Sequence, residues 1–460
     1  MRRYLNIWNF VIIGILSSFP FLEYFFVNPN DSRTEMLEEW SSLILELERT
    51  TGGYRPPVAA RMHGYIGLGA YLASIKDEDF EDLNCFMQSM KHHVSLDQIG
   101  MDAALSVNSS YARLAELFFI TAPPEQFIKI KELESKFRKK LSKSVDLEVK
   151  MKSIGHGIKC ADLVWKFSVS DKSGHDAFLY NYDETYIPPE CPVCWQKTGN
   201  RPMPALLPKW KNARTLIVDT NEVKVLAPPE SCETDFSKLY QQAYEVMLVK
   251  NNLAREDKWI AEFWSDDIPG LTMSPPGRWF SIATQAANKV NLNFQKRLEV
   301  NLTLGLAMSD ISILVWNGKY TYHLMRPETF IQNNVSRDWF PHIPTPAFPT
   351  YPSGHSAFGA VADVVLSSYF GEQFELTDNT HKNRTEFEGT PRTFSSFKEM
   401  SIENAWSRVL AGVHFRMDCD AGLDLGYKAG HLFMEKIGRP IKSTSDKLET
   451  SAAVKNQNIF

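Results

Sequence analysis

The sequence of 460 residues has few long apolar runs and few stretches in which apolar and polar residues alternate. Beyond the N-terminus, no stretch approaches the roughly 18 uncharged apolar residues that a membrane-spanning helix needs, which excludes a bundle of membrane helices. The scarcity of alternating stretches argues against a β-sandwich or barrel, because half-buried strands alternate with a period of two. We therefore predict an all-α helical bundle with one major core.

Charge of one sign and cysteine are also scarce. Lys and Arg number 50 against 55 Asp and Glu, a net charge of −5, so we expect no nucleic acid as a partner, and any basic site for an anion must be local. Six scattered cysteines argue against a disulfide-dense scaffold. Only Cys191 and Cys194 have a suggestive spacing. A local disulfide or two free thiols fit them better than zinc, for which two further ligands are missing.

The N-terminus carries the one long uncharged segment. Arg2 and Arg3 precede an apolar run that stays uncharged until Glu23. Residues 1–28 therefore indicate a signal sequence or an uncleaved signal anchor rather than a buried first helix. We expect an exported protein, periplasmic or secreted, that contacts a membrane only through such an anchor. A small-x-small cleavage site is not evident, so cleavage stays open.

Most of the remaining chain shows helical periodicity. Residues 170–232 lack it and form a long irregular connection, either a wall over a site or a passive surface excursion. We predict an N-terminal helical region with this loop over residues 33–232, a C-terminal helical catalytic core over 233–440 and a disordered tail over 441–460. Amphipathic helices of the first half offer a face for a homodimer. The predicted helices are 33–52, 57–75, 111–120, 124–150, 154–168, 235–250, 254–265, 278–293, 295–317, 355–370, 401–414 and 419–437.

Three short blocks carry the chemistry. Residues 319–327 read KYTYHLMRP, residues 347–358 read AFPTYPSGHSAF, and residues 407–418 read SRVLAGVHFRMD. Alone, the middle block is equally a turn with a serine and a buried structural histidine. Together the blocks fit K-x6-R-P, P-S-G-H and S-R-x5-H-x3-D in this order, over about a fifth of the chain.

Their polar residues form a cradle for a tetrahedral oxyanion. Arginine donates to two oxygens at once through its planar fork, and lysine adds a point charge. Glycine lets the backbone approach closely, and the start of a helix favours negative charge. The predicted oxyanion-binding residues are Lys319, Arg326, Ser353, Gly354 and Arg408.

With these motifs the chain resembles the superfamily that unites vanadium-dependent haloperoxidases with type 2 phosphatidic acid phosphatases. The helical region before the motifs is similar, more loosely, to the bacterial haloperoxidase-like branch. The resemblance implies a helical bundle and an oxyanion centre, which is vanadate in a haloperoxidase and a phosphate ester in a phosphatase. A third alternative is an oxyanion-binding protein without catalysis, which would not need two histidines in the motifs.

Within this resemblance the two motif histidines take different roles. His414 is expected to bind the vanadium or phosphorus atom through one ring nitrogen, and Asp418 to fix its tautomer through the other. His355 is placed to exchange a proton with the apical oxygen. Two further histidines near the motifs, His323 and His342, either bond in the pocket or merely pack.

The resemblance favours a haloperoxidase that oxidises halide with hydrogen peroxide, and the alternative is an acid phosphatase with a phosphohistidine intermediate. Trp316 lies one helical turn before Lys319, where fungal-type haloperoxidases have a tryptophan near the metal. Phe348 matches the aromatic residue that packs over the centre in chloroperoxidases. Asp267 is similar to a carboxylate that supports the basic cluster, although Asp266 is its neighbour.

Overall fold

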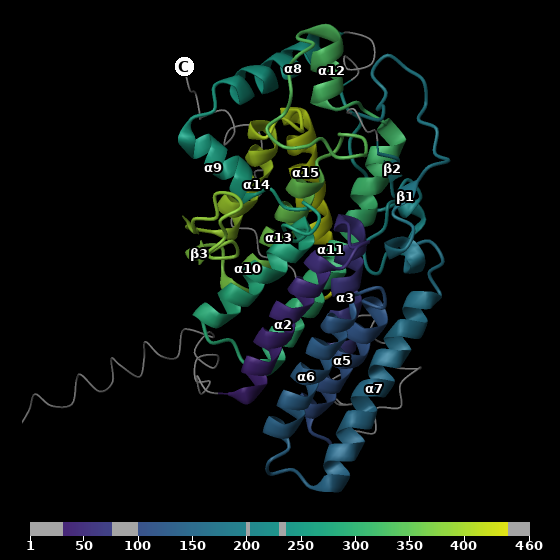
Figure 1. The fold of residues 1–460 in the computed structure, drawn as a ribbon, viewed down its shortest axis with the longest axis vertical. Coiled ribbons are helices and arrows are strands. Elements are labelled where there is room, and N and C mark those ends of the chain that lie inside the picture. Colours follow the sequence, from purple (N-terminus) through teal and green to yellow (C-terminus); the bar gives the residue numbers. More distant parts are fainter. Residues whose placement is uncertain (1–30, 76–99, 199–202, 230–235, 440–460) are drawn as a thin grey trace, which may run out of the picture.

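A computed structural model describes residues 31–75, 100–198, 203–229 and 236–439. These residues are mainly helical, which confirms the predicted all-α bundle (Figure 1). The predicted leader over residues 1–28 and the predicted tail over 441–460 lie outside the described residues.

The first half of the chain forms neighbouring helices in the lower part of Figure 1. α5 begins before the predicted start at residue 111, because Asp102 caps it by accepting a hydrogen bond of 2.8 Å from the Leu105 amide. The predicted helix over 124–150 is wrong, since residues 142–146 separate two helices. The helices are α2 (Ser32–Thr50), α3 (Pro56–Leu72), α5 (Ala103–Phe118), α6 (Pro124–Leu141) and α7 (Leu147–Val169).

The middle connection has little regular structure but is firmly attached to the core. The carboxylate of Asp310 accepts hydrogen bonds of 2.7 to 2.9 Å from the amides of Leu216, Ile217 and Val218. Burial raises the pKa of Asp310 to about 7, although these three amides oppose the shift. The connection contains η3 (His175–Phe178), β1 (Tyr182–Asp183), β2 (Ala205–Leu206) and η4 (Trp210–Asn212), with β1 antiparallel to β2.

Cys191 and Cys194 form a disulfide within this connection. The backbone beside it pairs with the chain that leads into the R-P motif: the Met325 amide donates to the Val193 carbonyl at 2.8 Å. Cys194 itself forms an antiparallel bridge with Leu324. The disulfide turn therefore supports the segment between two predicted anion-binding residues.

The second half of the chain surrounds α11, which starts at the Asn293 cap and continues to the end of the first motif block. α12 was not predicted, and the predicted polar loop over 371–400 contains the antiparallel hairpin β3–β4. The elements are α8 (Phe236–Asn251), α9 (Arg255–Phe263), α10 (Pro275–Lys289), α11 (Phe294–Tyr322), α12 (Pro327–Asn334), α13 (Gly354–Phe370), β3 (Leu376–Asp378), β4 (Arg392–Phe394), α14 (Phe397–Leu410) and α15 (Arg416–Lys436).

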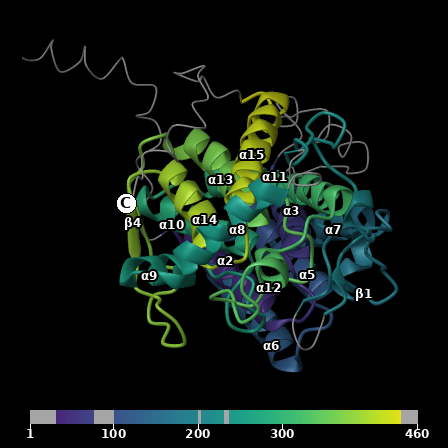
Figure 2. The ribbon, with the colours of Figure 1, turned by 90° about the horizontal axis from the view of Figure 1, so that it is seen from above.

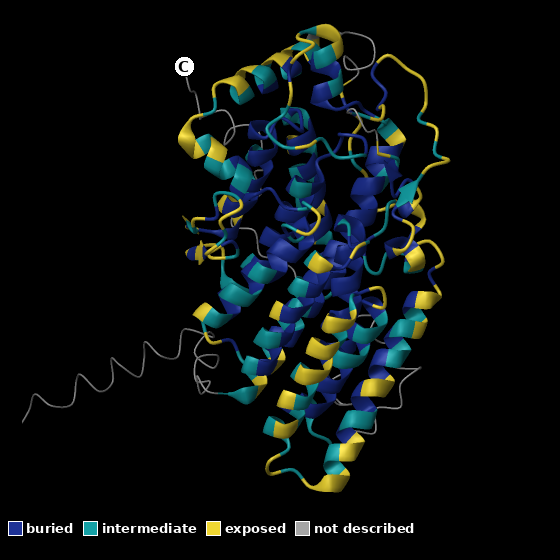
Figure 3. Ribbon diagram, in the orientation of Figure 1, coloured by how far each residue is buried: buried dark blue, intermediate teal, exposed yellow. Residues whose placement is uncertain are grey.

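α11 is the central helix of the core. It packs against α3 on one side and α13 on the other, and Figure 2 shows it between these groups. By length and composition it is apolar enough to cross a membrane, but 89% of its most apolar window is buried inside the protein. The buried residues around it belong to both halves of the chain, and the exposed residues lie on the outer helix faces (Figure 3). The first half therefore buttresses the helix that delivers Lys319.

Candidate active site

The three motif blocks meet at the C-terminal end of α11, around a cavity of about 300 Å³. Four predicted site residues do not line it and are fully buried behind its wall: Lys319, Arg326, Ser353 and Asp418. The connection also contributes to the wall, through Tyr182, Thr198 and Met203, so it is not a passive excursion. The predicted residues that line the cavity are Asp267, Trp316, Phe348, Gly354, His355, Arg408 and His414.

Lys319 organises the chain that approaches the P-S-G-H motif. Its ammonium group donates to the carbonyls of Pro349 at 3.0 Å, Thr350 at 2.9 Å and Pro352 at 2.6 Å. An ammonium has three protons, so these carbonyls take all of them. Burial and the nearby charge of Arg326 lower the pKa of Lys319. Without an anion, Lys319 therefore holds the loop, and a direct bond to an oxyanion stays a prediction.

Arg326 immediately precedes α12 and presents an unused donor. Its Nε donates to the Phe348 carbonyl at 2.9 Å, and its Nη1 donates to the Val413 carbonyl at 2.8 Å. The Nη2 atom is buried and has no hydrogen-bond partner among the described residues. An unpaired buried donor of a charged group is costly, so this atom calls for a ligand that accepts hydrogen bonds.

Arg408 projects from α14 into the cavity wall. Its Nη2 donates to the Trp264 carbonyl at 2.6 Å, and its Nη1 lies 3.4 Å from His355 Nε2. Burial lowers the pKa of Arg408 to about 10, and the charge of Asp266 opposes that shift. Asp267 instead pairs with Arg55 at 2.8 Å. Asp267 therefore contacts Arg55 rather than a motif cation, and its predicted support of the basic cluster stays a prediction.

Ser353 caps α13, as the motif predicts. Its hydroxyl oxygen accepts hydrogen bonds from the amide of Ser356 at 3.4 Å and from the Ser356 hydroxyl at 2.9 Å. The Ser353 proton stays available for an acceptor. Gly354 is the first residue of α13, where backbone amides and the helix dipole favour an anion.

His414 lies in the turn after α14, not on a helix as predicted. Gly412 has a φ of 78°, which ends the helical path before His414. The Nε2 atom of His414 lies 3.1 Å from Arg326 Nη1. Because a guanidinium can only donate, Nε2 must be the acceptor, and the neutral ring carries its proton on Nδ1. That proton faces Asp418 Oδ2 at 3.1 Å, so the predicted carboxylate partner is in place.

His355 differs from His414 in how firmly it is held. It is half-buried at the cavity, and its one contact to the motif residues is the 3.4 Å approach of Arg408. Burial and the neighbouring cations Arg408, Lys319 and Arg326 lower its pKa well below the ordinary value, so the ring is neutral.

His323 and His342 do not line the cavity. His323 Nδ1 lies 3.1 Å from the hydroxyl of Tyr186, and His342 Nε2 lies 3.3 Å from Glu262. Both are therefore packing and surface residues.

Within the three motif blocks, buried positive charge exceeds buried negative charge at the site. Lys319, Arg326 and Arg408 surround it, whereas Asp418 is the carboxylate in direct contact with the motif residues. Buried charges need a counter-charge, so the unused Nη2 of Arg326 and the cations together fit an oxyanion such as vanadate or phosphate. Among the described residues no group of three or more His, Cys, Asp or Glu side chains is arranged to hold a bare metal cation.

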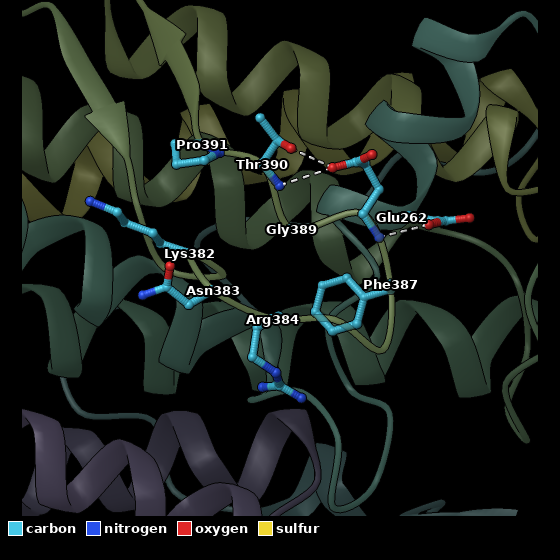
Figure 4. A pocket seen from close by; sticks show the side chains of 9 residues that line it. Glu262, Lys382, Asn383, Arg384, Phe387, Gly389, Thr390 and Pro391 are labelled. Carbon is cyan, nitrogen blue, oxygen red and sulfur yellow. Dashed lines mark hydrogen bonds between the residues drawn. The ribbon is translucent and has the colours of Figure 1, made fainter.

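A second hollow of about 570 Å³ lies on the surface between α9 and residues 382–391 (Figure 4). It shares no residue with the motif blocks. Its polar groups bond one another: Glu262 accepts from the Glu388 amide at 3.0 Å, and Glu388 accepts from the Thr390 amide at 3.2 Å. With these groups satisfied internally, the hollow is not the candidate active site.

Comparison with known proteins points to the same family as the geometry. Residues 299–443, about a third of the chain, match the family model described as the VCPO second helical-bundle domain. The vanadium chloroperoxidase of Curvularia inaequalis is 25% identical in an alignment of 224 residues, and the match covers 35% of this chain and 36% of that protein. The match thus spans about a third of the relative's length.

Two solved structures resemble nearly the whole fold. A bacterial vanadium-dependent iodoperoxidase superposes with a TM-score of 0.75 at 25% identity, covering 89% of this chain and 98% of that one. The holo form of a bacterial vanadium-dependent chloroperoxidase gives a TM-score of 0.65 at 17% identity, covering 85% and 94%. Over nearly its whole fold the chain thus resembles bacterial vanadium-dependent haloperoxidases, and its residues 299–443 match the VCPO second helical-bundle domain.

Proposed function

We propose that the protein is a vanadate-dependent haloperoxidase that oxidises a halide with hydrogen peroxide. The observation that carries the proposal is the unused Nη2 donor of buried Arg326 beside the Nε2 lone pair of His414. A hydrogen-bond donor on Arg326 and a ligand nitrogen on His414 lie next to each other. This arrangement suits an oxyanion whose central atom also binds a histidine. The similarity to vanadium-dependent haloperoxidases supports vanadate as that oxyanion, and the similar proteins include both a chloroperoxidase and an iodoperoxidase. The choice of halide is therefore left to experiment.

In this proposal the residues of the cradle bind and orient the oxyanion. Arg326 Nη2, the Ser353 hydroxyl and the Gly354 amide donate to its oxygens, and Arg408 and Lys319 balance its charge. His414 Nε2 is the ligand. Bound vanadate supplies a Lewis-acid centre that activates peroxide towards attack by halide. His355 Nε2, neutral in this site, accepts a proton from the peroxide and returns it later.

Two aromatic residues that the resemblance associates with haloperoxidases pack beside the cradle. The rings of Trp316 and Phe348 pack with centroids 5.1 Å apart. The Phe348 ring also lies 4.8 Å from the Arg326 guanidinium and 5.0 Å from Lys319 Nζ. It therefore shields two cations of the cradle from water on the cavity side. Less water strengthens the hold of these cations on an anion.

The alternative is an acid phosphatase, which the protonation of His414 suits equally well. With the proton on Nδ1, the Nε2 lone pair would turn from Arg326 Nη1 to phosphorus and displace the leaving oxygen, which forms a phosphohistidine. His355 would first take up a proton and then pass it to the leaving oxygen. The same residues serve both reactions, because five-coordinate vanadate resembles the transition state of phosphoryl transfer.

The purified protein, with orthovanadate or in phosphate-free buffer, would be assayed for peroxide-dependent oxidation of chloride, bromide and iodide. Hydrolysis of p-nitrophenyl phosphate would be followed in the same preparation. Halide oxidation that requires vanadate supports the proposal. Phosphate release that vanadate inhibits, without oxidation of any halide, overturns it in favour of the phosphatase. His414→Ala should lose either activity together with anion binding.

We also propose that the enzyme is exported, acts on peroxide and halide, and forms a homodimer. Its mass in solution tests the dimer. The apolar N-terminus after Arg2 and Arg3 supports export. The disulfide between Cys191 and Cys194 fits an oxidising compartment. Cell fractionation tests the export, and recovery of the protein in the cytoplasm would contradict it.

A further inference from the structure

Thr350 connects all three motif blocks, although it belongs to none of their fixed positions. The residue is completely buried. Its amide donates to the Leu324 carbonyl at 2.9 Å, and its carbonyl accepts from Lys319 Nζ at 2.9 Å. Its hydroxyl donates to Asp418 Oδ2 at 2.5 Å and lies 3.1 Å from His414 Nδ1. The backbone and the side chain of Thr350 thus both form hydrogen bonds with residues of the candidate site.

The direction of these hydrogen bonds follows from the donors available. A carboxylate only accepts, so the hydroxyl proton of Thr350 points to Asp418. The lone pairs of the Thr350 oxygen then face His414 Nδ1, which must carry the proton because Arg326 donates to Nε2. The His414 proton is therefore shared between the Thr350 oxygen and Asp418 Oδ2.

Asp418 alone is a crowded partner for His414. Its Oδ2 accepts from the Thr350 hydroxyl, from the Phe415 amide at 2.9 Å and from His414 Nδ1. Its Oδ1 is buried without a hydrogen-bond partner among the described residues. Without the Thr350 hydroxyl, the carboxylate would be free to rotate towards other donors. The hydroxyl thus fixes the acceptor as well as the histidine.

We propose that Thr350 is a positioning residue of the oxyanion site, whose hydroxyl holds Asp418 and the Nδ1 proton of His414 so that the Nε2 lone pair faces the anion. The inference rests on the oxyanion site of the proposed function, but not on which reaction follows. It is independent of the metal, because the hydrogen bonds exist around the anion-free histidine.

The experiment compares Thr350→Val, which removes the hydroxyl at nearly constant volume, with Thr350→Ser, which keeps it. Nitrogen NMR of protein labelled with 15N-histidine reports the tautomer without any anion, and His414→Ala assigns the signal. Calorimetry then measures orthovanadate and inorganic phosphate binding. We expect Thr350→Val to lose the single Nδ1–H tautomer and to bind orthovanadate 10- to 100-fold more weakly, as is usual for partners that orient a ligating histidine. Thr350→Ser should stay within about threefold of the wild type.

Thr303→Val is the matched control. Thr303 is a buried residue of α11 whose hydroxyl lies 2.9 Å from that of Tyr369, about 24 Å along the helix from Lys319. It should lose stability without a change in anion binding or in the His414 signal. If Thr350→Val does not fold, Thr350→Ala is measured in the same way.

Two outcomes would overturn the inference. Wild-type tautomer and affinity in Thr350→Val would show that the hydroxyl positions nothing, and an equal loss in Thr350→Ser would show that packing is responsible. An enzyme that oxidises no halide but keeps the Thr350 effects would refute the proposed function and leave the positioning role intact.

Discussion

His414 and His355 are chemically the same side chain, yet their contacts prepare them for different work. Both ring nitrogens of His414 have partners, Arg326 on Nε2 and the pair of Thr350 and Asp418 on Nδ1. His355 has its 3.4 Å approach to Arg408 and otherwise faces the cavity. A ring held on both sides suits a ligand, whereas a ring with freedom to reorient suits proton exchange.

Replacing His355 by alanine tests this division. The cradle donors are unchanged in His355→Ala, so we expect orthovanadate affinity within a few fold of the wild type. Turnover should fall by about 10²- to 10⁴-fold, the usual contribution of a general acid or base. Calorimetry and steady-state kinetics measure the two quantities. His342→Ala, outside the cavity, is the control. A parallel loss of affinity and turnover in His355→Ala would contradict the role of His355 in proton exchange and indicate that it binds the anion.

Asp267 provides a prediction about stability and pH. Burial raises its pKa to about 7; Arg55 opposes the shift, and the charges of Glu48 and Asp266 add to it. In the unfolded chain the pKa is about 3.9. The folded state therefore keeps this proton to higher pH. Its contribution to stability is fully present below about pH 4 and is lost as the pH rises to about 7.

In Asp267→Asn this dependence disappears, and asparagine tolerates the φ of 75° at this position. We expect the free energy of unfolding of the wild type, relative to the variant, to fall as the pH rises from 4 to 8, by at most about 4 kcal/mol. Urea unfolding at a series of pH values measures it. Asp424→Asn, at the ion pair with Lys428 on α15, is the control for the loss of a carboxylate outside the cavity. A difference that rises with pH would contradict the assignment.

Single residues also show which parts of the candidate site can be predicted from the sequence. The cradle was predictable because residue types and spacing specify it within three blocks. The partners of Asp266 and Asp267 were not, since Arg55 and Arg278 reach these neighbouring residues from distant parts of the chain. Thr350 carries no charge and no motif position, so its role emerged only from its contacts with Lys319, His414 and Asp418.

At the scale of elements, the contact between α13 and α15 sets the position of an anion donor. Gly422, Gly426 and Gly430 recur every four residues along α15 and face α13. A Cβ added at Gly422 would lie 2.8 Å from the Cβ of Ser356 and even closer to the carbonyl of Ser353. Because Ser353 caps α13, this close approach places its hydroxyl.

Gly422→Ala should therefore affect the site as well as the fold. Alanine favours a helix, but the clash must move α13 or α15, with a cost of about 1–3 kcal/mol. Since small displacements of binding groups are expensive, we expect orthovanadate affinity to fall by about tenfold or more. Thermal unfolding and calorimetry measure both effects.

Gly64→Ala is the matched control for this contact. A Cβ at Gly64 would lie 2.9 Å from the Gly305 carbonyl, where α3 crosses α11 away from the cavity. We expect a similar loss of stability with affinity kept within about twofold. Unchanged affinity in Gly422→Ala as well would mean that the α13–α15 contact does not position Ser353.

The elements themselves were predictable where apolar residues repeat. They were less predictable where charged residues or a glycine set the end of a helix. α2, α8, α9 and α13 begin and end close to their predicted limits. The division between α6 and α7 falls in a charged stretch without an apolar pattern to locate it. α12 has only eight residues, and the turn that holds His414 follows from the left-handed conformation of Gly412.

At the scale of the whole molecule, the candidate oxyanion site brings together parts of the chain that are far apart in the sequence. The net charge is −5, yet Lys319, Arg326 and Arg408 are buried together at the end of α11. Their mutual repulsion and lost hydration disfavour the anion-free folded state. A ligand that binds this state and not the unfolded chain stabilises the entire fold.

We therefore expect orthovanadate and phosphate to raise the melting temperature, in proportion to the logarithm of their concentration. At 100 times Kd, the bound anion should add about 2.7 kcal/mol to the free energy of unfolding. Arg326→Met should lose most of this increment, because it removes the unused Nη2 donor. Arg297→Met is the control, since Arg297 is a buried arginine that donates to the Leu292 carbonyl at the start of α11. It should melt at a lower temperature but keep the full increment. An anion effect that persists in Arg326→Met, or is absent from the wild type, would place the oxyanion elsewhere than beside His414.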